Sequence, residues 1–252
     1  MHIPLDENTL IERKRNLPVA KANTFVRKAR YNLTTQQLRI VHHIISKIKI
    51  DDDDLKIYKF DLKEFARICG IECNGKNYAN FMDSLKALRD KSFWMQEGNR
   101  MMLVSWFERL EINMYDTTVS LRLDDRLKPY LLHLQNHFTQ YNYGTLLSLT
   151  CKHAIRLYEM FVSYDDVGVM EVEIDELKEL LGCQEYATYY DFRRYVIEKS
   201  LQQINEYTEL NVTYYPIKKG RSMHALTFLI SKKSEEEANG LRFRRDIELN
   251  GC

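Results

Sequence analysis

Between residues 189 and 205 the sequence carries side chains that can read the bases of DNA. At about 100° per residue, five polar side chains fall on the side of a helix opposite its apolar residues: Arg194, Tyr195, Glu198, Lys199 and Gln202. Arginine can fork onto guanine, glutamine onto adenine, and glutamate can accept from cytosine. Tyr189 and Arg193 lie in the first turn, from which Arg193 would reach a phosphate. We predict that this helix binds DNA; the alternative is an ordinary surface helix with scattered charge.

A basic turn follows this helix in the sequence. Lys218, Lys219 and Arg221 surround Gly220, which suits a tight turn because glycine adopts positive φ at little cost. Three cations at such a tip are suited to phosphate contacts. Strands are predicted on either side, at residues 210–216 and 223–230. A helix followed by a hairpin with a basic tip is the layout of a winged helix, whose helix enters a groove of DNA while its wing lies along the phosphates.

An earlier helix, predicted from Asn77 to Arg89, carries a weaker version of the same chemistry. Its outward face includes Asn80, Asp83 and Lys86, and Lys76 precedes it. This face has fewer cations and contains an acid. We therefore expect Lys76, Asn80 and Lys86 to make accessory, less specific DNA contacts, with packing against protein as the alternative.

The elements that must position these two helices follow the same order in both halves of the chain. Four positions match at one constant offset: Leu62, Phe65, Ile68 and Gly70 with Ile174, Leu177, Leu180 and Gly182. The repeat predicts an α+β fold of two tandem winged-helix (helix-turn-helix) domains. We place the first at residues 16–135 and the second at 136–233, with a charged tail at 234–252 and a joining helix around 127–134.

Helix caps and strands of the first unit can be predicted in more detail. Thr34 or Thr35 is expected to cap one helix and Asp61 the next. Three strands are expected after the Asn77–Arg89 helix: residues 93–96, 101–113 and 117–123. Glu97-Gly98-Asn99 would form the tight turn of a hairpin between the first two.

Composition excludes several classes of protein. The chain of 252 residues has a net charge of +1, 44% hydrophobic and 29% charged residues, which is normal for a globular protein. It contains no run of about 18 apolar residues, so no membrane span is predicted. Five cysteines without a paired pattern indicate reduced thiols. The polar stretch Met1–Arg15 contains no apolar signal segment, which favours a cytoplasmic protein.

No catalytic or cofactor signature is visible, so no enzyme activity, cofactor or metal site is predicted. Gly70 to Lys76 has the spacing of a phosphate-binding loop, but Asn77 replaces the serine or threonine that binds magnesium, and Glu72 would repel phosphate. We interpret this segment as a turn between helices. His42 and His43 are adjacent and point to different sides of a helix. His133 and His137 could share a metal, but no third ligand stands near them in the sequence.

The C-terminal pattern resembles that of iteron-binding plasmid replication initiators of the RepB/RepE type. The similarity lies in these segments: Tyr190, Phe192-Arg193-Arg194, Val196-Ile197, Ile204 to Thr208, Leu210-Asn211-Val212 and Pro216 to Arg221. Asn32-Leu33-Thr34, Gln37-Leu38-Arg39 and the helix Tyr78–Leu88 look like the first domain of that family. The resemblance covers about residues 15 to 233, and the tail lies outside it.

This resemblance implies two winged helices and two assembly states. Monomers of such initiators bind repeated origin sites (iterons) on double-stranded DNA with both domains. Dimers join through the first domain and repress their own gene at an operator inverted repeat. Host initiator, replicative helicase and chaperones are implied as partners, in the cytoplasm of a bacterium. Two rivals remain: a plain dimeric winged-helix transcriptional repressor, and a replication nickase or ATPase.

Overall fold

The structure is a computed structural model that describes residues 6–49, 52–238 and 240–241. Its first half contains, in order, α1 (Glu7–Arg15), β1 (Pro18–Ala22), α2 (Asn23–Lys28), α3 (Thr35–Ile45), β2 (Tyr58–Asp61), α4 (Leu62–Ile68), α5 (Gly75–Asp90), β3 (Ser92–Glu97), β4 (Arg100–Ser105), β5 (Phe107–Ile112), β6 (Thr118–Leu123) and, after a 3-10 turn at Asp125–Leu127, α6 (Lys128–Leu131). The predicted joining helix around 127–134 is this short α6 with its preceding turn.

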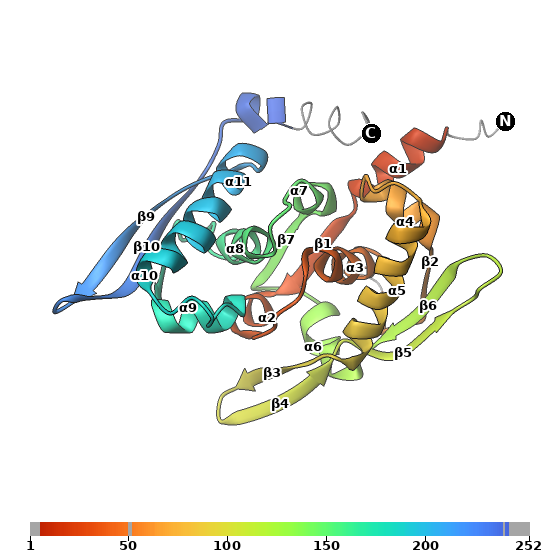
Figure 1. Ribbon diagram of the computed structural model, residues 1–252, viewed down its shortest axis with the longest axis horizontal. Helices are drawn as coiled ribbons and strands as arrows, with labels where there is room; N and C mark the ends of the chain where they lie inside the picture. Colours follow the sequence, from red (N-terminus) through yellow and green to blue (C-terminus); the bar gives the residue numbers. More distant parts are fainter. Residues whose placement is uncertain (1–5, 50–51, 239, 242–252) are drawn as a thin grey trace.

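The second half contains fewer strands. In order, it has β7 (Phe138–Asn142), α7 (Tyr143–Leu147), α8 (Lys152–Val162), β8 (Val169–Glu173), α9 (Ile174–Leu181), α10 (Tyr189–Phe192), a π-helical turn (Arg193–Glu198), α11 (Lys199–Tyr207), β9 (Leu210–Lys219) and β10 (Ser222–Lys232). The two halves lie side by side, with the hairpins β5–β6 and β9–β10 at opposite ends of the molecule (Figure 1).

Two three-stranded antiparallel sheets confirm the predicted repeat. One has the order β2-β6-β5 and the other β8-β10-β9, so the first strand of each unit pairs with the last. In each unit a helix precedes the first strand, and two helical segments separate that strand from the hairpin. Helix, strand, two helices and a hairpin make a winged helix, and the chain contains two of them in tandem.

Local capping signals of the first unit are confirmed. The Thr34 hydroxyl accepts a hydrogen bond from the Gln37 amide while the Gln37 side chain accepts one from the Thr34 amide, which makes a capping box at the start of α3. The Asp61 carboxylate accepts from the Glu64 amide at the start of α4. Gly70–Asn74 forms the turn between α4 and α5, and Asn74 caps α5. α5 therefore begins two residues before the predicted Asn77.

One predicted strand was wrong. Residues 101–113 form two strands, β4 and β5, which belong to different sheets. The chain breaks at Trp106, whose side chain is buried among aromatic rings, with its ring centroid 4.7 Å from that of Phe93 and 5.0 Å from that of Tyr31. β3 and β4 thus form a separate hairpin, turning at Gly98 with φ +55°. This hairpin is inserted between α5 and the wing β5–β6, and the second unit has no counterpart.

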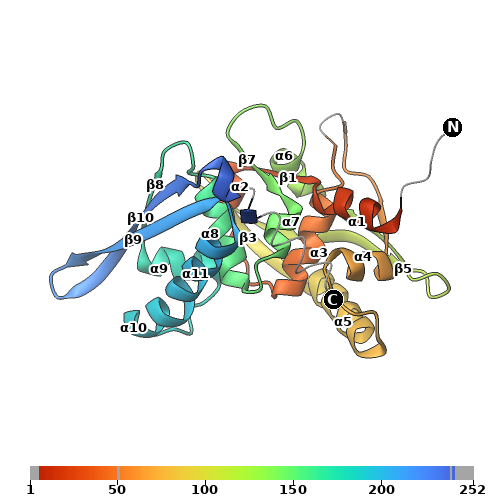
Figure 2. The same cartoon turned by 90° about the horizontal axis from the view of Figure 1, so that it is seen from above.

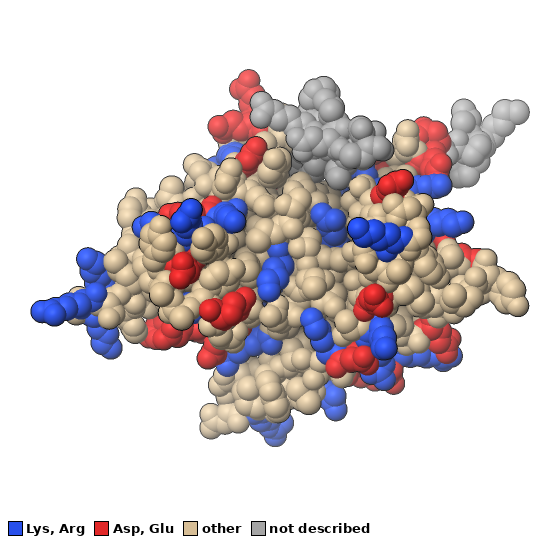
Figure 3. All heavy atoms as spheres, viewed as in Figure 1, with Lys and Arg blue, Asp and Glu red and all other residues tan. Residues whose placement is uncertain are grey.

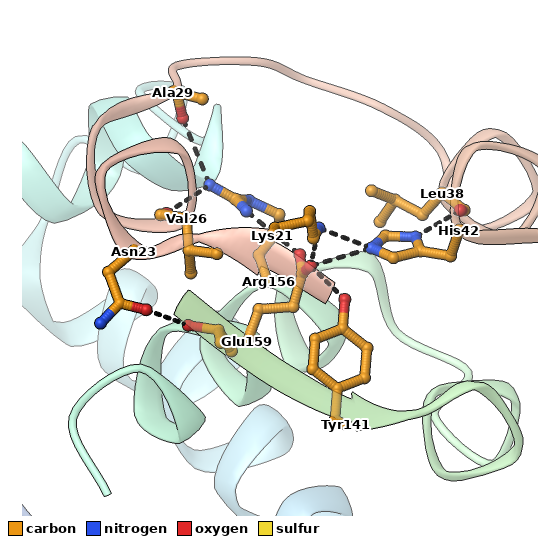
Figure 4. Close-up of polar contacts among 10 residues, drawn as sticks. Lys21, Asn23, Val26, Ala29, Leu38, His42, Tyr141, Arg156 and Glu159 are labelled. Carbon is orange, nitrogen blue, oxygen red and sulfur yellow. Dashed lines mark hydrogen bonds and ion pairs between the residues drawn. The ribbon is translucent and has the colours of Figure 1, made fainter. Parts of the chain in front are cut away.

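A buried ionic cluster joins the two units. Glu159 of α8 is fully buried and accepts hydrogen bonds from Lys21 of β1 and from the Tyr141 hydroxyl, and its other oxygen lies 3.1 Å from Nη1 of Arg156 (Figure 4). His42 Nε2 lies 2.9 Å from the same carboxylate. The strands that carry Lys21 and Tyr141 also pair with each other, because β1 runs antiparallel to β7. Since the cluster takes residues from both halves, it ties them into one core.

Candidate nucleic-acid interface

The segment predicted to read DNA is helical without a break from Tyr189 to Tyr207. Its middle part, Arg193–Glu198, is a π-helical turn between α10 and α11. Thr188 caps it by accepting a hydrogen bond from the Asp191 amide. The predicted apolar face is buried: Phe192, Val196, Ile197, Leu201 and Ile204. The predicted outward residues are all exposed: Arg194, Tyr195, Glu198, Lys199 and Gln202. A π-turn widens the helix locally and recurs at functional sites.

Three of the outward residues form a cation–aromatic cluster. The Arg194 guanidinium lies 5.4 Å from the Tyr195 ring centroid and the Lys199 ammonium lies 5.2 Å from it. Arg194 Nη1 is also 3.5 Å from the Tyr190 hydroxyl, and Tyr186 stacks beside Tyr195 with centroids 6.4 Å apart. Two cations around one partly exposed ring form a surface on which a phosphate or a base edge can bind.

The other predicted residues of this helix lie toward the wing. Arg193 pairs with Glu198 at 3.3 Å, so both side chains already have a protein partner. Burial, followed by the nearby Tyr189 and Glu198, raises the pKa of Tyr214 on β9. Tyr189, Arg193 and Glu198 therefore cluster against the first strand of the wing. Gln202 lies one turn beyond Glu198 on the exposed face of α11.

The second wing has the predicted basic tip. Lys218, Lys219 and Arg221 are exposed around Gly220, whose φ of +64° requires a residue tolerant of the left-handed region. β9 and β10 pair over their whole length, so the hairpin carries its cations well away from the core (Figure 1). Lysine and arginine atoms dominate this tip of the surface (Figure 3).

The first domain offers a different surface. Lys76, Asn80 and Lys86 are exposed on α5, with Asp83 exposed among them. The tip of its wing, residues 113–117, carries no cation; instead the side chain of Tyr115 is 101% exposed and that of Met114 is 68% exposed. α5 and α10 nevertheless protrude from the same side of the molecule (Figure 2). One DNA duplex laid on that side would meet both helices.

Sequence reasoning missed two exposed tyrosines beside the predicted residues. Tyr190 is 57% exposed and contacts Arg194, and Tyr215 is 58% exposed on β9. Tyr190 could have been found because it stands four residues before Arg194, which places the two side chains together on a helix. Tyr215 gives no such signal, since its neighbourhood depends on the register of the wing.

Two tandem winged helices with a basic second wing are typical of DNA-binding proteins. Comparison with protein families shows which family this chain belongs to. Residues 18–162 match the family model described as "Initiator Replication protein, WH1", and residues 173–230 match "Initiator Rep protein, WH2". The chain belongs to this family of replication initiators, as the sequence resemblance predicted. The two models divide the chain between residues 162 and 173, whereas our predicted boundary lies at 135/136. That boundary stays a prediction. The tail 234–252 also stays a prediction, and much of it lies outside the described residues.

One solved structure supports the fold. The Pi initiator protein, crystallised in complex with iteron DNA, is 17% identical; the match has a TM-score of 0.70 and covers 88% of this chain and 99% of that one. Domains 2 and 3 of RctB match less well, with 12% identity, a TM-score of 0.48, and coverage of 81% of this chain and 84% of that one. The first match supports the tandem winged-helix architecture.

Two features are absent from the described residues. Within residues 6–49, 52–238 and 240–241, no helix is both long and apolar enough to span a membrane. The same part of the chain holds no group of three or more His, Cys, Asp or Glu side chains arranged to bind a metal ion.

Proposed function

We propose that this initiator binds directly repeated origin sites (iterons) on double-stranded DNA and thereby starts plasmid replication without a catalytic step of its own. The observation that carries the proposal is the exposed Arg194–Tyr195–Lys199 cluster, flanked by the basic wing of the second winged helix. The Pi initiator, which shares the fold, was crystallised on iteron DNA. We place the protein in the bacterial cytoplasm, where plasmid DNA lies.

Each part of the interface has a role in this proposal. Arg194, Lys199 and Gln202 would read base edges in the major groove. Tyr189, Tyr195, Arg193 and Glu198 would shape the same contact, because Arg193 and Glu198 hold each other in place. Lys218, Lys219 and Arg221 would neutralise phosphates along the wing. Lys76, Asn80 and Lys86 of α5 would add contacts in a neighbouring groove.

We also propose that a second copy of the chain docks on the β3–β4 hairpin. Trp94, Met101 and Leu103 share its outward face and are each about half exposed, at 50%, 50% and 48%. The sheet has only two strands, so within the described chain β4 has an unpaired edge. Exposed apolar residues beside a free strand edge favour association with another strand. Such a dimer would repress the initiator's own gene at an inverted repeat.

Binding measurements test the proposal and its rivals together. Sites selected by the protein from random duplex should each bind one monomer, and origin DNA should carry them as direct repeats with one monomer per repeat, measured by anisotropy across a salt series. If about six phosphates are neutralised, log affinity should fall with log salt at a slope of about −5. Recognition only of an inverted repeat by a dimer would point to a plain repressor. Cleavage of the duplex or hydrolysis of ATP would instead point to a nickase or ATPase.

Partners beyond DNA follow from the same proposal. A replicative helicase must be loaded once the origin is open, so we expect the bound monomer to contact the host initiator and the replicative helicase. Conversion of dimers to monomers would draw on chaperones. Pull-down from a bacterial extract onto origin DNA, with and without this protein, would identify which of these are recruited.

A further inference from the structure

Two lysines from different parts of the chain meet at the seam between the winged helices. Lys91 follows the end of α5, and Lys152 opens α8. The Lys91 ammonium donates to the Asn32 carbonyl at 2.8 Å and to Gln37 Oε1 at 3.0 Å. The Lys152 ammonium donates to Asn32 Oδ1, also at 2.8 Å. Asn32 thus holds both ammonium groups beside each other.

Among the described residues, no acid is in direct contact with this pair of like charges, although the charge of Glu185 reaches His153 and Cys183, as that of Lys152 does. Neither lysine forms an ion pair with a carboxylate in the part of the chain that the structure describes, and the nearby Glu179 already pairs with Arg30 at 3.3 Å. Burial, followed by the charge of Lys152, lowers the pKa of Lys91. Neutral amide oxygens satisfy the hydrogen bonds of the two ammonium groups but cannot neutralise them. Holding two cations together in this way is unfavourable unless an anion joins them.

The seam also lies between the two helices assigned to DNA. The amides of Thr150 and Cys151, just before α8, donate to the Gln203 side chain of α11 at 3.0 and 3.2 Å. Lys91 stands one residue after the last residue of α5. Figure 1 shows α3 and α8 between α5 and α11. A duplex that reaches both reading helices must pass the seam.

Asn32 is fixed tightly enough to set the position of the lysines. Thr35 Oγ1 donates to the Thr150 carbonyl at 3.1 Å, which joins the start of α3 to the start of α8. Gly182, with φ +59°, approaches Asn32 so closely that a Cβ there would lie 2.6 Å from the Asn32 Cβ. The lysine pair therefore belongs to a packed junction of the two domains, rather than to a mobile surface loop.

We propose that Lys91 and Lys152 together clamp one phosphate of the DNA backbone, at a point between the groove entered by α5 and the groove entered by α10 and α11. The inference rests on the proposed function, since it assumes DNA on this side of the molecule. One phosphate offers two non-bridging oxygens, which matches the two ammonium groups. The clamp fixes the position of the seam on the duplex, and thereby the spacing of the contacts that the two domains make.

Single-phosphate substitution tests the clamp. Phosphates of the selected site are replaced one at a time by uncharged methylphosphonate, and affinity is measured for the wild type, Lys152→Gln, Lys91→Gln and a matched control, Lys59→Gln. Lys59 is an exposed lysine of β2 that the interface does not use. Circular dichroism establishes that each variant is folded. We expect one position between the two contact regions where methylphosphonate weakens the wild type about tenfold, the size of a lost charge-assisted contact.

The variants decide the outcome. Methylphosphonate at that position should not weaken binding by Lys152→Gln any further. The salt slope of this variant should be shallower than that of the wild type by about 0.9. Lys91→Gln should behave in the same way, whereas Lys59→Gln should match the wild type. Equal sensitivity of all four proteins at every phosphate, or an unchanged slope in both seam variants, would overturn the clamp. Both results presuppose a selected site, so failure to select any site would count against the proposed function and not against the clamp alone.

Discussion

Arg194 is the side chain to which we assign most of the base recognition in the proposed interface. It is exposed, lies against Tyr195 and Tyr190, and has no ion-pair partner in the described chain, whereas the neighbouring Arg193 is paired with Glu198. Arg194→Ala should therefore lower discrimination between the selected site and random duplex by about 1–3 kcal/mol, with the fold intact. Arg67→Ala is the matched control, because Arg67 is an exposed arginine that pairs with Glu7 on α1. Unchanged discrimination by Arg194→Ala would refute its assignment as a base reader.

His43 makes the stability of the fold depend on pH. Its ring is buried beside Phe65 and Phe60, with centroids 5.0 and 5.3 Å away, and neither ring nitrogen has a hydrogen-bond partner among the described residues. Burial above all, together with the charges of Lys47 and Lys14, holds the pKa of His43 well below its usual value. Burial likewise lowers the pKa of His42, and that of His153 to about 4.

The sign of the effect follows from proton uptake. Below a pH of about 6.5 the unfolded chain binds protons at these histidines that the folded chain does not bind, so the free energy of unfolding falls as pH falls. Urea unfolding at pH 7.5 and pH 5 should show this loss, and His43→Phe should reduce it by up to about 2 kcal/mol. A variant with the same pH dependence as the wild type would mean that the buried ring does take up a proton.

At the scale of elements, the two wings differ in chemistry although their sheets share one order. The tip of β9–β10 carries Lys218, Lys219 and Arg221, while the tip of β5–β6 carries Met114 and Tyr115. Lys219→Ala should weaken binding to every sequence and make the salt slope shallower by about 1. Lys59→Ala removes an exposed lysine of β2 that lies at neither wing tip, and it should leave the slope unchanged. A loss confined to the selected site would contradict a phosphate-binding role for this wing.

The elements also show what a sequence can predict. α3, α4 and α9 were predictable because their caps and apolar spacing are local, as the Thr34 capping box and the left-handed Gly182 illustrate. The split between β4 and β5 was not, because it depends on burial of Trp106 among rings from distant segments. The pairing of β1 with β7, and the meeting of Lys91 with Lys152, are likewise products of the tertiary fold.

For the whole molecule, the buried cluster around Glu159 is the feature that holds the halves together. Glu159→Gln would leave Lys21 and Arg156 without their buried counter-charge. Breaking one partner of such a buried pair costs about 3–5 kcal/mol, so urea unfolding should shift to much lower denaturant. Glu108→Gln, which removes an exposed partner of Arg122, serves as the control and should shift it little. Equal stability of both variants would mean that the Glu159 cluster does not stabilise the junction, which strand pairing and packing would then hold together.

The inserted hairpin β3–β4 has a consequence for many copies on one DNA. Only the first domain carries it, and it projects from one edge of the molecule, between the basic wing β9–β10 at one end and the wing β5–β6 at the other (Figure 1). Molecules on direct repeats all point the same way, so a row of them has a head and a tail. The first and last members of such a row therefore present different faces to anything that binds beside them.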